Sequence, residues 1–247
     1  MYRLFCSLVL VCVPGPLLAQ TLSQRISQSR DGTVRLSFAA RPDVCSNGYC
    51  GIDVRHSSHE WQPDCTPQSV RVALKLSNHR VHSVRTYVGG RWLPDQTATD
   101  LGTVGVREAA SYFLNLAERS VNQLVAGDPL LPAVLADSVI IWPSLVSIAR
   151  TQEVSPEIRG RAVFWLGQAA GDEAGRALDS IAFDHRGDRE VRKQAIFALS
   201  QRSTDGVPAL IRIARSNPDS ELRKTAIFWL AQSQDPRAVS LFEEILK

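Results

Sequence analysis

The chain has 247 residues, of which 44% are hydrophobic and 21% charged, a balance that is typical of globular proteins and excludes a chain that is disordered throughout. Its formal net charge is only +3 and its basic residues are dispersed, so nothing in the composition points to nucleic acid as a partner. The length allows one large domain or two small ones.

Residues 1–19 have the pattern of a secretory signal peptide. Arg3 supplies a short positive start, residues 4–13 form an apolar run, and Pro14 begins a helix-breaking stretch. We expect cleavage after Ala19, because it places a small residue before the cut. The apolar run is too short to cross a bilayer. The sequence therefore predicts a bacterial protein that is periplasmic or secreted, with no membrane span in the mature chain.

A β-rich segment follows the expected cleavage site. Residues 20–32 are polar and turn-prone, and we expect a flexible lead-in there. Apolar residues then alternate with polar ones along three stretches, which start near Val34, Val70 and Val84. This alternation predicts a small antiparallel module over residues 33–93, with a long loop at 40–68. A module of this size has a marginal core, so a crosslink or docking on the rest of the chain would be needed.

Three cysteines, Cys45, Cys50 and Cys65, remain after the predicted signal peptide. In an oxidising compartment they suggest one disulfide and one free thiol, and three pairings are open. We favour Cys45–Cys65, which would tie the end of the first strand to the start of the second; Cys50–Cys65 is the alternative. His56 and His59 share the loop, so a zinc site is conceivable, but the spacing matches no standard finger. We expect neither metal nor cofactor.

The strongest signal in the sequence is an internal repeat. From about residue 104 the apolar spacing becomes helical, and three similar segments begin at Glu157, Glu190 and Glu221, 33 and 31 residues apart. They read EIRGRAVFWLGQ, EVRKQAIFALSQ and ELRKTAIFWLAQ. A second recurring helix lies between them. Two amphipathic helices in each unit of about 32 residues are typical of an α-solenoid. The predicted fold class is therefore α+β, with the solenoid over residues 104–247.

Each repeated segment follows a residue that can cap a helix, namely Ser155, Asp188 and Asp219. A side-chain oxygen at this position accepts a hydrogen bond from a free N–H group of the first turn. The glutamates that begin the segments add negative charge beside the positive end of the helix dipole. The second helix of each unit is thus predicted to begin directly after its cap.

The repeated unit resembles HEAT-type repeats, including the subgroup named after the phycobilisome lyases. The residues that carry the resemblance are an aliphatic residue and an arginine, followed by Ala-[Val/Ile]-Phe-x-Leu; the paired residues are Ile158-Arg159, Val191-Arg192 and Leu222-Arg223. The resemblance covers residues 140–247 well and 104–139 loosely. It implies a ladder between repeats in which acidic caps meet helix arginines, a role for Asp188, Asp219, Arg192 and Arg223. Ser155 departs from the acidic pattern.

A polar and aromatic column runs along the repeated helices. On a helical wheel the glutamines lie about 180° from the arginines, and the phenylalanines lie beside the glutamines. The candidate partner-binding face consists of Phe164, Gln168, Phe197, Gln201, Phe228 and Gln232. Such a stripe can form a concave surface for a protein partner. Alternatively, the aromatic residues pack against adjacent repeats.

The sequence contains no nucleophile elbow, phosphate-binding loop or His-Glu-x-x-His motif, so we expect a protein that is not an enzyme. The favoured hypothesis is an exported interaction scaffold with a protein partner. One alternative is a lyase-like protein that handles a cofactor or chromophore, which the resemblance suggests, although those lyases act inside the cell. The other is an envelope metal-binding module built on the cysteine and histidine loop.

Overall fold

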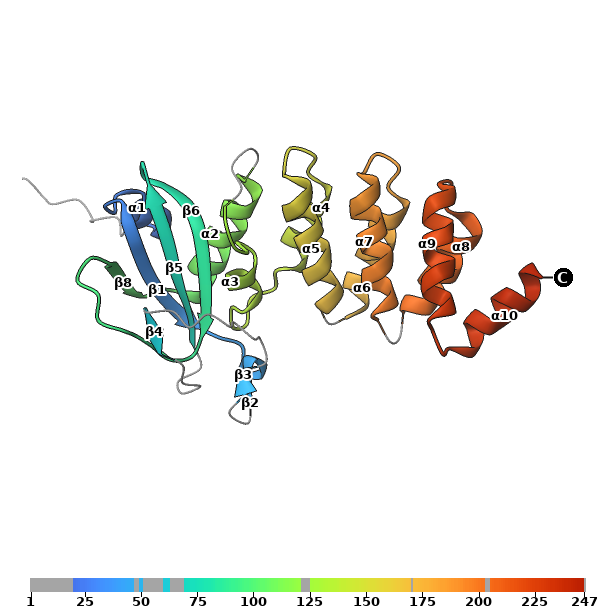
Figure 1. Cartoon of the computed structure of the whole chain (residues 1–247), viewed down its shortest axis with the longest axis horizontal. Coiled ribbons are helices and arrows are strands. Elements are labelled where there is room, and N and C mark those ends of the chain that lie inside the picture. Colours follow the sequence, from blue (N-terminus) through green and yellow to red (C-terminus); the bar gives the residue numbers. More distant parts are fainter. Residues whose placement is uncertain are drawn as a thin grey trace, which may run out of the picture.

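A computed structural model describes residues 20–46, 49–50, 60–62, 69–120, 125–169, 171–202 and 205–246. A β-sheet module lies at one end, and helix pairs extend away from it in a row (Figure 1). This arrangement confirms the predicted α+β class with a C-terminal run of helical repeats. The predicted signal peptide, residues 1–19, lies outside the described residues.

The main sheet has four strands in the order β6-β5-β1-β8. The three strands expected from the alternation, β1 (Gly32–Ala39), β5 (Ser69–Ser77) and β6 (Arg80–Val88), form antiparallel pairs. The fourth strand, β8 (Thr99–Thr103), runs parallel to β1, so the sheet is mixed and not purely antiparallel as predicted. β8 lies beyond the expected end of the module at residue 93. Its sequence, TDLGT, carries no apolar alternation that could have revealed it.

The segment predicted to be a flexible lead-in contains a helix, α1 (Leu22–Ser27). Thr21 and Gln24 form a capping box, in which each side chain accepts a hydrogen bond from the backbone N–H of the other residue. Leu22 and Ile26, one turn apart, are buried in the core. The capping box and the burial of one face therefore stabilise α1, although the segment is polar in composition.

Smaller β ribbons flank the main sheet: β2 (Cys45–Ser46) pairs with β3 (Tyr49–Cys50), and β4 (Trp61–Gln62) pairs with β7 (Arg91–Trp92). A short 3-10 turn, η1 (Pro42–Val44), precedes β2. The backbone register of β2 and β3 places Cys45 opposite Cys50. Cys65, His56 and His59 lie outside the described residues, so the Cys45–Cys65 disulfide stays a prediction.

The helices after the sheet are α2 (Val106–Glu118), α3 (Leu131–Val134), α4 (Trp142–Arg150), α5 (Pro156–Gln168), α6 (Asp172–Phe183), α7 (Arg189–Ser200), α8 (Gly206–Ser216), α9 (Ser220–Ala231) and α10 (Pro236–Ile245). We call α4, α6, α8 and α10 the A helices and α5, α7 and α9 the B helices. Three A–B pairs follow one another, and α10 begins a fourth.

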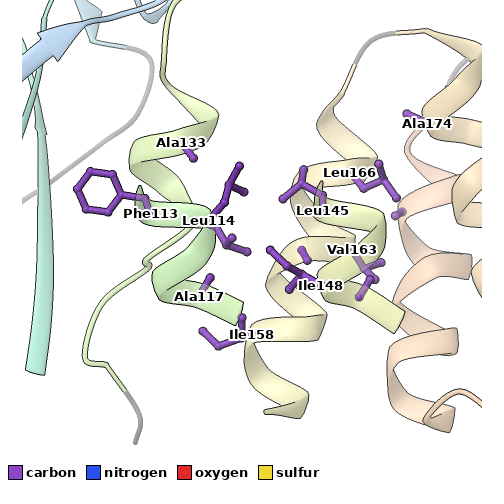
Figure 2. Close-up of a cluster of buried hydrophobic side chains, with 14 of the residues drawn as sticks. Phe113, Leu114, Ala117, Ala133, Leu145, Ile148, Ile158, Val163, Leu166 and Ala174 are labelled. Atoms are coloured by element: carbon purple, nitrogen blue, oxygen red, sulfur yellow. The ribbon is translucent and has the colours of Figure 1, made fainter. Parts of the chain in front are cut away.

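Helix α2 joins the sheet to the repeats through its two faces. Phe113 points toward the sheet, where its ring lies 6.3 Å from that of Phe38 (Figure 2). Leu114 lies on the opposite side, toward Ile148 of the first helix pair. All of these side chains belong to one continuous buried cluster. The β-rich module therefore does not depend on a core of its own but shares one with the repeats.

The predicted repeat columns form the core of the helical part. The alanine and leucine that recur in each B helix are fully buried; they are Ala162, Ala195, Ala226, Leu166, Leu199 and Leu230. The cap residues Ser155, Asp188 and Asp219 each accept a backbone hydrogen bond from the first turn, as predicted. Successive B helices also pack more closely than successive A helices do. The layer of B helices is therefore the inner side of the row.

Candidate interaction surface on the B helices

Two arginines lie buried between successive helix pairs. Arg159 and Arg192 are only 6% and 5% exposed. Nη2 of Arg159 lies 3.9 Å from Oδ2 of Asp188, and Nη1 of Arg192 lies 3.9 Å from Oδ2 of Asp219. At this separation the attraction is electrostatic and not a hydrogen bond. Each aspartate thus caps its own B helix and faces the arginine of the preceding one.

Backbone carbonyls accept a hydrogen bond from each of these arginines. Nε of Arg159 donates to the carbonyl of Val154, and Nε of Arg192 donates to that of Ala182. Arg223 donates to the carbonyls of Asn217 and Pro218, and it forms no ion pair with any carboxylate among the described residues. The structure therefore joins Arg159 and Arg192 to acidic caps but does not do so for Arg223.

A buried asparagine completes the second of these junctions. Asn217, which is 1% exposed, donates to the carbonyl of Ala182 and accepts hydrogen bonds from Arg192 and from the backbone N–H of Asp219. The burial of Asn217 was not predicted from the sequence, because an asparagine before a proline is typical of a surface turn. Its only sequence signal is its position two residues before an acidic cap.

The candidate face is exposed along the B helices. Phe164, Phe197 and Phe228 are 48%, 40% and 56% exposed. The glutamines of the same column are exposed as well; they are Gln168, Gln201 and Gln232. The structure thus brings all six candidate residues to the surface on the inner layer of helices.

The aromatic side chains also contact one another, as the packing alternative predicted. The rings of Phe164 and Trp165 meet edge to face at 4.9 Å, as do those of Phe228 and Trp229 at 5.0 Å. The ring of Phe197 lies 4.9 Å from Trp229 of the following repeat. Because half of each phenylalanine stays exposed nonetheless, packing inside the protein uses only part of this aromatic surface.

A groove of about 380 Å³ lies between α5 and α7. It forms where Ala198 occupies the position that Trp165 and Trp229 hold in the other two B helices. The two helices approach closely, because a Cβ atom on Gly167 would lie 2.9 Å from that of Ala198. The missing tryptophan thus leaves a hollow in the aromatic stripe.

The groove has apolar walls and a polar rim. Phe164 and Phe197 form the walls, and Gln168 and Gln201 lie at one end. At the other end, Arg161 forms a 2.7 Å ion pair with Glu157 and donates to the carbonyl of Gly127. The charged groups at the rim therefore satisfy one another, and the amides offer both donors and acceptors.

In the part of the chain that the structure describes, no three His, Cys, Asp or Glu side chains lie together in a group that could hold a metal ion. No helix within that part is long and apolar enough to cross a bilayer.

Comparison with known proteins agrees with the geometry of the repeats. A family model of HEAT repeats matches residues 180–247. This range covers the last four residues of α6 and the described α7 to α10, and the α4–α5 pair repeats the same motif. A search of curated proteins found no match. The helical C-terminal part of this chain is therefore built from HEAT-type repeats.

Proposed function

We propose that this protein is an exported, non-catalytic scaffold that binds a protein partner through the groove between α5 and α7. Stacked helical repeats create extended binding surfaces on one side. The observation that supports the proposal most directly is the replacement of tryptophan by Ala198, which opens a hollow between two half-exposed phenylalanines. Protein interfaces commonly depend on one apolar side chain that enters such a hollow.

The chemistry of the groove indicates what the partner presents. Its apolar walls suit a leucine or an aromatic side chain. Gln168 and Gln201 can each donate to a carbonyl and accept from an N–H group, so they suit the main chain of an extended segment. Because Arg161 and Glu157 already pair with each other, the rim favours an uncharged segment over a strongly acidic or basic one.

Export and the disulfide belong to the same proposal. The signal-like pattern of residues 1–19 supports export to the periplasm or the medium, with a mature chain that starts at Gln20. In that oxidising environment Cys45 and Cys65 would form a disulfide that fixes the long loop beside the sheet. The β module would then be a rigid end of the scaffold, since it already shares a core with the repeats.

Filling the groove tests the proposal. Proteins captured by the mature chain from envelope extracts would be purified, and their affinities for the wild type and for Ala198→Trp would be compared. Ala198→Trp places in α7 the side chain that the other two repeats carry, so we expect binding weakened by about tenfold or more. Because Ala198 is only 5% exposed and lies against Gly167, the unfolding temperature of this variant is measured alongside its affinity. Phe164→Ala, which removes one wall, is expected to weaken binding too.

Ile140→Ala is the control, because Ile140 is an exposed apolar residue (79%) that lies outside both the groove and the candidate face. Partners that bind all three variants as tightly as the wild type would contradict the proposal.

A further inference from the structure

The β-rich module has a groove of its own, which the repeat motif does not explain. It has a volume of about 720 Å³ and is bounded by α1, by α2 and by the turn between β5 and β6. Helix α1 packs against α2 beside it. We call it the module groove. Its volume falls in the range of about 300–1,000 Å³ that is usual for small-molecule sites.

The base of the module groove is apolar. Leu22 and Ile26 of α1 line it and are only 1% and 3% exposed. Val81, Tyr112 and Leu116 also line it, are partly exposed and pack against the main core. Tyr112 and Leu116 lie one turn apart on the same face of α2. An apolar chain placed in the groove would therefore meet hydrophobic surface from all three elements.

Cationic groups lie at the edge of the same groove. Arg80 and Arg119 line it and are exposed, and their side chains form no hydrogen bond or ion pair within the described part of the chain. The only carboxylate among the described lining residues is Glu108, which accepts a hydrogen bond from the backbone N–H of Leu22. Glu108 and Arg119 lie eleven residues apart, roughly 16 Å along α2. The end of the groove at Arg119 is therefore cationic.

A neutral hydroxyl accompanies the cation at this end. Burial raises the pKa of Tyr112 to about 12, and the positive charge of Arg119 acts in the opposite direction. The hydroxyl therefore stays protonated at neutral pH, close enough to Arg119 to respond to its charge. It forms no hydrogen bond with any residue that the structure describes. A hydroxyl donor beside a guanidinium is a suitable arrangement for a carboxylate.

The turn that carries Arg80 has a fixed conformation. Asn78 and His79 are both left-handed, with φ of 51° and 57°, as in the tight turns that close hairpins. The two carboxylate oxygens of Asp31 accept hydrogen bonds of 2.7 and 2.9 Å from the backbone N–H groups of these residues. The edge of the groove is thus held in place before any ligand arrives.

We propose that the module groove binds a small amphiphile of the fatty-acid class, with one carboxylate and an unbranched apolar chain. The carboxylate accepts hydrogen bonds from the Tyr112 hydroxyl and from Arg119, while the chain lies along Leu116 and the α1 side chains. The two free arginines disfavour a cationic amphiphile. This site is independent of the α5–α7 groove.

The probe is decanoate, added below its micelle-forming concentration to the purified mature protein in isothermal titration calorimetry. We expect saturable binding of one decanoate per chain. Butyrate keeps the carboxylate but loses most of the chain, so it should bind about tenfold more weakly or worse. Decyltrimethylammonium keeps the chain but reverses the charge, and we expect no saturable binding.

Variants locate the site. Arg119→Gln is expected to weaken decanoate binding by about tenfold, and Tyr112→Phe, which removes only the hydroxyl, by about threefold to tenfold. Arg107→Gln is the matched control, because Arg107 is an exposed arginine of the same helix outside the groove. Ala198→Trp should leave decanoate binding unchanged, which separates this test from that of the α5–α7 groove.

Absence of saturable decanoate binding would overturn the proposal, as would equal binding of decyltrimethylammonium. Wild-type affinity in both Arg119→Gln and Tyr112→Phe would also overturn it. Phosphatidylglycerol vesicles distinguish a membrane surface from a free amphiphile: a protein that binds these vesicles but not decanoate would contradict the proposal.

Discussion

Nη1 of Arg192 lies 3.9 Å from Oδ2 of Asp219, across the boundary between the second and third helix pairs. The arginine is buried, and the aspartate also caps α9 and accepts a hydrogen bond from Arg189. The Asp219 carboxylate therefore caps α9 and also interacts with the exposed Arg189 and the buried Arg192. This geometry explains why the acidic cap and the arginine recur together in the sequence.

The buried arginine should matter far more for stability than the exposed one that contacts the same carboxylate. Arg192→Ala is expected to lower the free energy of unfolding by about 2–4 kcal/mol, because it leaves a cavity and removes one of the hydrogen-bond partners of Asn217. Arg189→Ala, at an exposed position, is expected to cost less than about 1 kcal/mol. Urea unfolding of both variants measures the difference, and equal losses would contradict this account of the ladder.

The cap of α10 should persist in acid. Hydrogen bonds from the Arg237 side chain and from its backbone N–H lower the pKa of Asp235 to about 2. Because the folded pKa lies below the unfolded one, the cap contributes stability above about pH 4 and loses it as the pH falls toward 2. NMR titration of the Asp235 carboxyl should show a midpoint near 2, and Arg237→Ala should raise it. A midpoint near 4 in the wild type would contradict the prediction.

A polar cluster on the sheet should stabilise the β-rich module. Glu60 accepts a 2.6 Å hydrogen bond from the Tyr87 hydroxyl and lies 3.9 Å from the buried guanidinium of Arg35. Glu60→Ala is therefore expected to cost about 2–3 kcal/mol in thermal or urea unfolding. Arg85→Ala removes only the exposed partner of Glu60 and is expected to cost about 0.5 kcal/mol. If both variants unfold alike, the cluster does not contribute in this way.

The predicted disulfide can be read from the mature protein. Mass spectrometry without reduction should show a chain that begins at Gln20 and has one intramolecular disulfide, and peptide mapping should assign it to Cys45 and Cys65. Because the backbone places Cys45 opposite Cys50, mapping must also separate that pairing. Three free thiols together with stoichiometric zinc would show that the loop is a metal site instead.

The regular features of this fold were predictable, because they repeat. The caps Asp188 and Asp219 and the buried alanine column follow from a motif that occurs three times, and the structure confirms these positions. The first three strands of the sheet follow from alternation of apolar residues. In both cases one face of the helix or strand is buried, so apolar residues recur in the sequence with the period of that element.

The irregular features depend on tertiary contacts that leave no periodic pattern in the sequence. Strand β8 is held by its parallel register with β1, and its own residues carry no strand pattern. Asn217 is buried because two helix pairs close over it. Ala198 was visible in the sequence as a departure from tryptophan, but only the approach of α5 and α7 shows that the departure opens a groove.

Site-specific photo-cross-linking tests the central claim most directly. A photoreactive amino acid at Phe197, in the groove, would be compared with one at Arg176, which is exposed on the A helix α6. In envelope extracts we expect a discrete cross-linked protein from position 197 only, and we expect Ala198→Trp to abolish it. The same products from both positions, or products from position 197 that survive Ala198→Trp, would contradict a scaffold that binds its partner through this groove.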